Sequence, residues 1–101
     1  MKNELKKRMY AGEQLYGTWI TVESPIMTEL MSSLGFDYFV IDMEHAPLDH
    51  RMVQTLMQAM RPDTNTTPLV RVWWNDLVAI KRVLDIGAPG IMVPWINNKE
   101  D

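Results

Sequence analysis

Strand-like and helix-like segments alternate along this chain, and the alternation restricts its fold more than any other feature. The strand-like segments are rich in β-branched and aromatic residues, and they span residues 16–22, 38–43, 69–73 and 90–94. A helix-like segment follows each of the first three. Strands that alternate with helices in this way form parallel pairs joined by right-handed crossovers. The sequence therefore predicts an α/β fold built from (β/α) units.

The helix-like segments carry start and stop signals. Ser24 and Pro25 indicate a helix that ends near Gly35, and its apolar residues at helical spacing are Ile26, Met27, Leu30, Met31 and Leu34. Asp49 and Asn75 are the expected N-caps of the next two helices, and Gly87 ends the second of these. Residues 62–67 have loop chemistry. A short amphipathic helix over residues 2–11 precedes the first strand, and residues 97–101 resemble the start of another helix.

Composition excludes several classes of function. The chain has 101 residues, of which 47% are hydrophobic and 23% charged, with a formal net charge of −3, so it is at most one globular domain. A nucleic-acid partner is not expected, because no basic excess is available to release counterions. The absence of cysteine excludes disulfides and a cysteine nucleophile. No apolar run reaches the roughly 20 residues of a membrane span, and no signal peptide is recognisable, so we expect a cytoplasmic protein without membrane contact.

The densest group of reactive side chains follows the second strand. Asp42 and Glu44 alternate along the strand and so share one face, and His45 comes directly after them. Chemistry in parallel α/β folds is concentrated at the carboxyl ends of strands, and histidine exchanges protons near neutral pH. The alternative, a loop histidine beside two helix-capping acids, fits this local pattern equally well.

Three more residues stand out by position. Arg71 lies within a strand between apolar neighbours, where a charge is costly unless it is paired. Its planar fork can hold a carboxylate or a developing enolate; the alternative is an edge-strand arginine in solvent. Asp85 lies near a helix C-terminus, where an acid opposes the macrodipole. It therefore calls for a partner (His45, Arg71 or a neighbouring subunit) unless it is simply solvated. Trp19 can wall a pocket or pack in the core.

These residues together resemble the beginning of the HpcH/HpaI aldolase family, which comprises metal-dependent (class II) pyruvate aldolases. The matching stretches occur in the family's order and cover almost the whole chain; they include residues 17–19, 41–47, 69–73, 84–88 and 93–94. The resemblance implies a TIM (β/α)8 barrel, usually in a homo-oligomer. A complete barrel takes roughly 250 residues. We therefore expect residues 1–101 to be a single partial domain that forms about the first half of the barrel.

The resemblance also implies roles for individual side chains. His45 would be the catalytic base, Asp85 would raise its basicity, and Arg71 would stabilise the pyruvate enolate. Asp42 and Glu44 look like support around a metal-bound water and the histidine. These roles are expectations that come from the family and not from the spacing of the residues.

The implied reaction is cleavage or formation of 2-keto-3-deoxy or 4-hydroxy-2-oxo acids, which gives pyruvate and an aldehyde, with Trp19 as a wall of the substrate pocket. A divalent metal (Mg, Mn or Co) is expected for the complete enzyme. The family's Glu and Asp ligands lie in the second half of the barrel and none is expected in this chain, so the 101 residues alone should be inactive. The alternative is a non-catalytic half-barrel that acts as an association or binding module through its open strand edges.

Overall fold

A computed structural model describes residues 4–93 and shows the predicted alternation of helices and strands. The elements are α1 (Glu4–Tyr10), β1 (Gly17–Ile20), α2 (Pro25–Ser32), β2 (Tyr38–Asp42), α3 (His50–Ala59), β3 (Thr67–Arg71), α4 (Leu77–Asp85) and β4 (Gly90–Met92). The strands form one sheet in the order β1-β2-β3-β4, and each neighbouring pair is parallel. The prediction of an α/β fold from parallel (β/α) units is therefore confirmed. The helix start expected at residues 97–101 lies outside the described residues.

The strands differ in extent from the prediction because pairing decides where they end. β1 stops at Ile20 instead of residue 22, and β3 runs from Thr67 to Arg71 instead of over residues 69–73. Thr67, expected in a loop, pairs with Tyr38 of β2. Beyond Arg71 the chain leaves the sheet, and Trp73 becomes half-exposed. Residue composition alone does not reveal this parallel register.

Side-chain caps begin the three helices that follow strands. Ser24 Oγ accepts a hydrogen bond from the Met27 amide (3.1 Å), and Asp49 Oδ1 accepts one from the Met52 amide (2.8 Å), both as predicted. For α4 the prediction was one residue early, because Asp76 and not Asn75 is the N-cap. Both residue types suit this position, and the extended backbone that an N-cap requires falls at Asp76 (φ −132°, ψ 128°).

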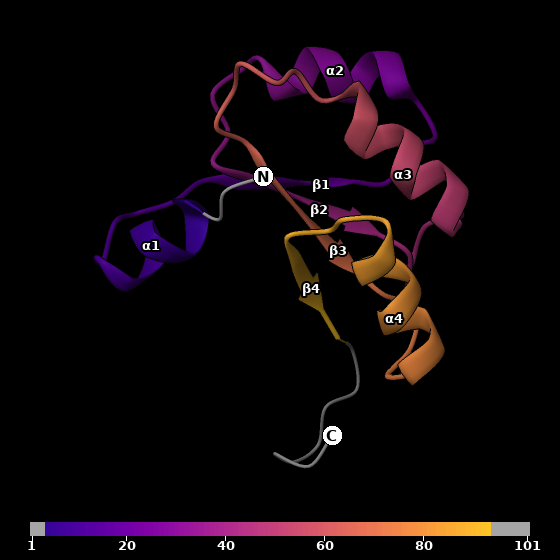
Figure 1. Ribbon diagram of the computed structural model, residues 1–101. Coiled ribbons are helices and arrows are strands. Elements are labelled where there is room, and N and C mark those ends of the chain that lie inside the picture. The colour runs from indigo at the N-terminus through magenta and orange to yellow at the C-terminus, as the bar shows by residue number, and fades with distance from the viewer. Residues whose placement is uncertain (1–3, 94–101) are drawn as a thin grey trace.

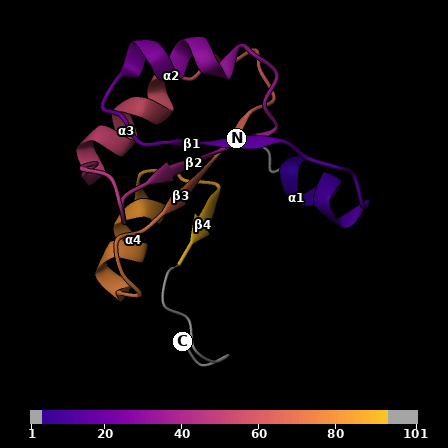
Figure 2. The ribbon, with the colours of Figure 1, turned by 180° about the vertical axis from the view of Figure 1, so that it is seen from behind.

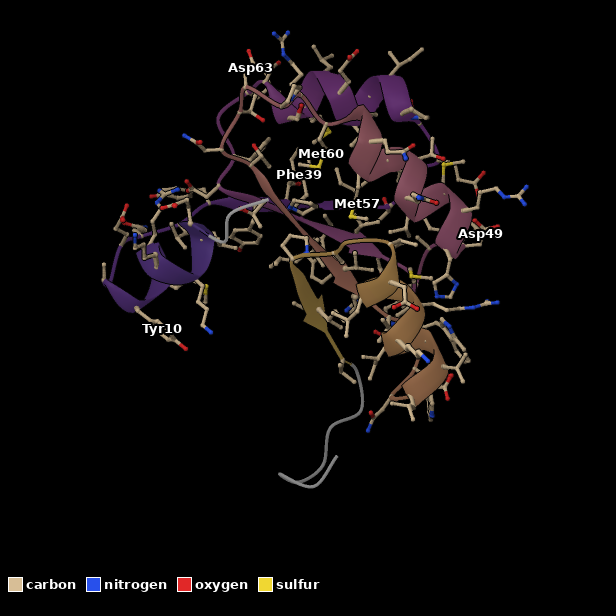
Figure 3. All side chains as sticks on the ribbon, in the orientation of Figure 1. Tyr10, Phe39, Asp49, Met57, Met60 and Asp63 are labelled. Carbon is tan, nitrogen blue, oxygen red and sulfur yellow. The ribbon has the colours of Figure 1, made fainter. Side chains whose placement is uncertain are left out.

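The helices α2, α3 and α4 cover one face of the sheet, whereas α1 lies apart from them near the edge where the strands begin (Figures 1 and 2). The core fills the space between the three helices and the sheet. Phe39, Met57 and Met60 point into this space (Figure 3). The fully buried side chains of the core include Phe39, Ile41, Val53, Leu56, Val70, Val72 and Val83. Among residues 4–93, every helix is too short and too polar to cross a membrane.

The helix α2 packs with an unexpected face toward the sheet. Thr28 and Ser32 are fully buried, whereas Ile26 and Leu30 of the expected apolar stripe are 80% and 61% exposed. Both buried hydroxyls are satisfied by backbone groups, since Thr28 Oγ1 donates to the Ser24 carbonyl (3.0 Å) and Ser32 Oγ donates to the Glu29 carbonyl (2.6 Å). Ser32 Oγ also accepts from the Arg61 amide (3.1 Å). These small side chains let the helix lie close to the core, and the large ones point outward.

The helix α1 is attached to the sheet by an ion pair. Arg8 Nη1 lies 2.7 Å from Asp37 Oδ1, just before β2, and Asp37 Oδ2 accepts a hydrogen bond from the Tyr16 amide (2.8 Å). The apolar side of the helix is buried at Leu5. These contacts hold α1 across the end of the sheet where the strands begin.

We expect Leu56→Ala to destabilise the chain by about 2–5 kcal/mol, because it removes a fully buried side chain and leaves a cavity between α3 and the sheet. The measurement is the free energy of unfolding from urea denaturation. Gln54→Ala, on the exposed side of the same helix, is the matched control and should change it by less than about 0.5 kcal/mol. Equal losses in the two variants would contradict the placement of α3.

Candidate active site

Polar side chains gather at the carboxyl ends of β2 and β3. Asp42 is the last residue of β2 and Arg71 is the last residue of β3, and the parallel register pairs them directly. Glu44 and His45 follow Asp42 in the loop that leads to α3. The structure therefore brings together, within one chain, four of the residues that the sequence singled out.

A two-point ion pair between Asp42 and Arg71 is the centre of this group. Arg71 Nε donates to Asp42 Oδ1 (3.0 Å) and Nη2 donates to Oδ2 (2.7 Å). The same Oδ1 also accepts hydrogen bonds from the amides of Glu44 (2.9 Å) and His45 (3.2 Å). One carboxylate thus fixes both the guanidinium and the loop that carries Glu44 and His45. With these four hydrogen bonds, Asp42 is a positioning residue.

Burial and hydrogen bonding act in opposite directions on Asp42. The side chain is only 4% exposed, and burial by itself raises the pKa of the carboxyl group. The hydrogen bonds from Arg71 and from the amides of His45 and Glu44, together with the charge of Arg71, outweigh burial and lower the pKa below its ordinary value. The hydrogen bond to Asp42 likewise raises the pKa of Arg71. The pair is therefore ionised at neutral pH.

Glu44 connects Arg71 to His45. Its Oε1 lies 3.3 Å from Arg71 Nε and 3.3 Å from His45 Nε2. The Glu44 side chain is mostly buried, whereas the His45 side chain is 69% exposed. The histidine is thus held at one nitrogen while most of its ring remains accessible, as a group that exchanges protons with a ligand must be.

Trp19 completes the surroundings of Arg71. The Arg71 Cζ atom lies 4.3 Å from the centroid of the Trp19 ring, a cation–π contact from β1 to β3. Asp42 takes the Nε and Nη2 edge of the fork and Trp19 takes one of its faces, so the guanidinium is restrained in two directions. A rigid cation of this kind suits an anionic ligand, because little side-chain entropy remains to be lost on binding.

Asp85 is not part of this group within one chain. It is the exposed last residue of α4, just before the turn that leads into the start of β4. Since α4 runs back from the carboxyl ends of the strands to their beginnings, Asp85 lies at the opposite end of the sheet from His45. The expected contact between these two residues is therefore not made inside a single copy.

Below the charged group lies a largely apolar pocket of about 510 Å³ that the sequence analysis did not single out. Its lining includes Leu5, Met9, Trp19, Tyr38, Val40, Leu69 and Met92. A signal for it was present in the strand pattern, because Tyr38 and Val40 share a face with Asp42. The pocket lies on the face of the sheet that α2, α3 and α4 leave open.

The site residues do not form a metal centre by themselves. Among residues 4–93, no three His, Asp or Glu side chains are grouped as a metal site would require. The Asp42 carboxylate is already engaged by Arg71 and two amides, and Glu44 faces Arg71 and His45. A metal would need ligands beyond these side chains.

Comparison with known proteins gives consistent matches. Residues 15–101 match the model of the HpcH/HpaI aldolase/citrate lyase family. Relatives named 4-hydroxy-2-oxo-heptane-1,7-dioate aldolase, from Shigella boydii and Salmonella arizonae, are each 40% identical over all 101 residues. The chain spans 38% of the length of each of these relatives.

Solved structures agree with the fold. A crystal structure of an HpcH/HpaI aldolase/citrate lyase family protein from Burkholderia cenocepacia superposes with a TM-score of 0.93 and 37% identity, over 98% of this chain and 39% of that one. The citrate synthase SbnG superposes with a TM-score of 0.83 and 34% identity, over 95% of this chain and 39% of that one. The four-stranded unit is thus a recurring part of larger proteins.

We expect Asp42→Asn to reduce the free energy of unfolding at neutral pH by about 1.5–3 kcal/mol, the contribution of hydrogen bonds to a charged group. Because the folded-state pKa of Asp42 lies below its unfolded value of about 3.9, the stabilisation is complete above that value. It is lost as the pH falls through the folded-state pKa. Urea denaturation of both proteins from neutral pH to about pH 2 measures this difference.

The control is Asp63→Asn, which removes an exposed carboxylate that pairs with Arg61. Screening by solvent makes such pairs weak, so this variant should stay close to the original protein. A loss in Asp42→Asn that persists unchanged at acid pH would contradict the role given to the ionised carboxylate.

Proposed function

Because the chain belongs to the HpcH/HpaI aldolase/citrate lyase family, we propose that it is the N-terminal part of a metal-dependent pyruvate aldolase, a carbon–carbon lyase. The observation that carries the proposal is Arg71, which is fixed by Asp42 and Trp19 at the carboxyl ends of the strands beside an exposed His45. The relatives named as aldolases and matched over the full length of the chain support the substrate class, a 4-hydroxy-2-oxo acid.

The proposed cleavage needs a cation and a base. His45 takes the proton of the substrate's 4-hydroxyl group, the bond between C3 and C4 breaks, and the hydroxyl-bearing carbon leaves as an aldehyde. The electron pair passes to C3 and forms the enolate of pyruvate. Arg71 stabilises the negative charge as it develops. A proton added at C3 then gives pyruvate, and the synthetic direction is the reverse.

The geometry divides these roles among neighbouring side chains. Asp42 fixes the guanidinium and the loop, so Arg71 and His45 are held at a defined separation. Glu44, within 3.3 Å of His45 Nε2, orients the ring and favours its protonated form once it has taken the proton. Trp19 forms a wall beside Arg71.

The proposal places the divalent metal and its ligands outside this chain. The described side chains that lie near Arg71 are engaged with one another and do not fit a metal site. We therefore propose that the ligands belong to the second half of the barrel, and that residues 1–101 alone have negligible aldolase activity. The active assembly would be a homo-oligomer of complete barrels.

The test uses a chimera of residues 1–101 with the remaining part of the Shigella boydii relative. In it, His45→Ala should lower kcat by about 10²–10⁴-fold with little change in pyruvate affinity, because His45 moves the proton and does not hold the keto acid. Steady-state kinetics and a pyruvate titration measure the two effects. His50→Ala, which changes the other histidine of the chain, is the control. Weakened pyruvate binding with normal turnover would contradict the role of His45.

In the same chimera, Arg71→Lys should impair both pyruvate binding and turnover. Lysine keeps the charge but loses the planar fork that Asp42 holds at two points. Arg61→Lys, a surface arginine paired with Asp63, is the matched control. If the chimera folds but forms citrate and releases no pyruvate from 4-hydroxy-2-oxo acids, the aldolase assignment is wrong.

The role proposed for Asp85 requires a second copy, because Asp85 and His45 lie at opposite ends of one sheet. We expect the His45→Ala and Asp85→Asn chimeras to be individually impaired and a mixed oligomer of the two to regain part of the activity. Partial recovery arises because some sites combine the intact His45 of one copy with the intact Asp85 of another. A normal Asp85→Asn chimera, or no recovery on mixing, would contradict this role.

A further inference from the structure

The outward surface of α2 has the wrong chemistry for contact with solvent. Its exposed large side chains are Ile26, Met27 and Leu30, and the apolar surface continues at Leu34 in the turn that follows. In contrast, the exposed residues of the adjacent helix α3 are Arg51, Gln54 and Gln58, all of them polar. We call the surface formed by Ile26, Leu30 and Leu34 the α2 stripe. An apolar surface of this kind marks an interaction site.

The direction of the α2 stripe excludes a cover from the same layer of helices. Leu30 is two residues away from both Thr28 and Ser32, the side chains that face the core. At 100° per residue it points about 160° away from both of them. Helices in one layer lie side by side and cover each other's flanks, so a further helix in this layer would leave Leu30 exposed.

The spacing of the α2 stripe is self-complementary. Leu30 lies four residues after Ile26 and four residues before Leu34, so the three side chains form one ridge along the helix. A two-fold axis at Leu30 brings Leu30 against its own copy and Ile26 against Leu34 of the other copy. Ridges of this kind interlock in the commonest class of helix pair, at a crossing angle of about −50°.

Charge also favours a second copy. Glu29 is the single charged residue in α2. Under the same two-fold axis it faces the position of Met31 in the other copy and not another acid. Two copies therefore meet without opposed like charges, whereas a strongly charged partner would find no complement on this helix. Two-fold homodimers are also the commonest assemblies of soluble proteins.

From these observations we propose that the α2 stripe is a homodimer interface, in which α2 packs against α2 of a second copy about an axis near Leu30. A stable interface buries about 800 Å² of each partner, so the stripe is the centre of the contact and not its full extent. The proposal does not depend on the aldolase reaction.

The absence of cysteine allows a direct test with single thiols. Leu30→Cys in the 101-residue chain should form a disulfide-linked dimer under mild oxidation, because the two-fold axis places the thiols of two copies side by side. Gln54→Cys, on the exposed face of α3, is the matched control and should remain monomeric on a denaturing gel. Equal cross-linking of the two variants, as expected for association through the open sheet edges or the concave pocket, would overturn the proposal.

A second measurement covers dimerisation without a cross-link. Leu30→Gln should weaken self-association in analytical ultracentrifugation by roughly tenfold or more, because each dimer loses two buried leucine side chains. Gln54→Leu is the control and should leave the association unchanged. A monomeric original chain at every concentration, or an unaffected Leu30→Gln variant, would also overturn the proposal.

Discussion

The ion pair between Asp42 and Arg71 is the interaction on which the site depends. Two strands end beside each other, and their last residues form a two-point contact that also holds the following loop through two amides. A buried carboxylate without this partner would be strongly destabilising. The same contact that makes Asp42 tolerable therefore sets the orientation of the guanidinium and the position of His45. Structure and proposed chemistry share one constraint at this point.

Much of this arrangement could be predicted from the sequence, because it depends on local signals. Ser24 and Asp49 cap their helices, and alternation along β2 puts Asp42 and Glu44 on one side. The exact cap of α4 and the ends of the strands could not be predicted, since they depend on loop conformation and on register. That Asp42 binds Arg71 at two points also depends on the pairing of β2 with β3.

The orientation of α2 shows a second kind of limit. Periodicity identified a helix with an apolar stripe, and an apolar stripe ordinarily faces the core. Here Thr28 and Ser32 face the core, because their hydroxyl groups bond to nearby backbone carbonyls and their small volume permits close packing. Sequence periodicity cannot distinguish a stripe that faces the core from one that faces another molecule. The position of Asp85 is a related case, because helix spacing does not indicate which end of the sheet a residue reaches.

The attachment of α1 affects how a ligand reaches the concave pocket. Leu5 and Met9 of this helix line the pocket, and the Arg8–Asp37 pair holds the helix at the end where the strands begin. Traffic from that side is obstructed, so small molecules arrive at and depart from the opposite mouth. That mouth is bordered by Arg71, a fixed cation. Anions would consequently be concentrated there before they bind, and their rate of entry should fall as ionic strength rises.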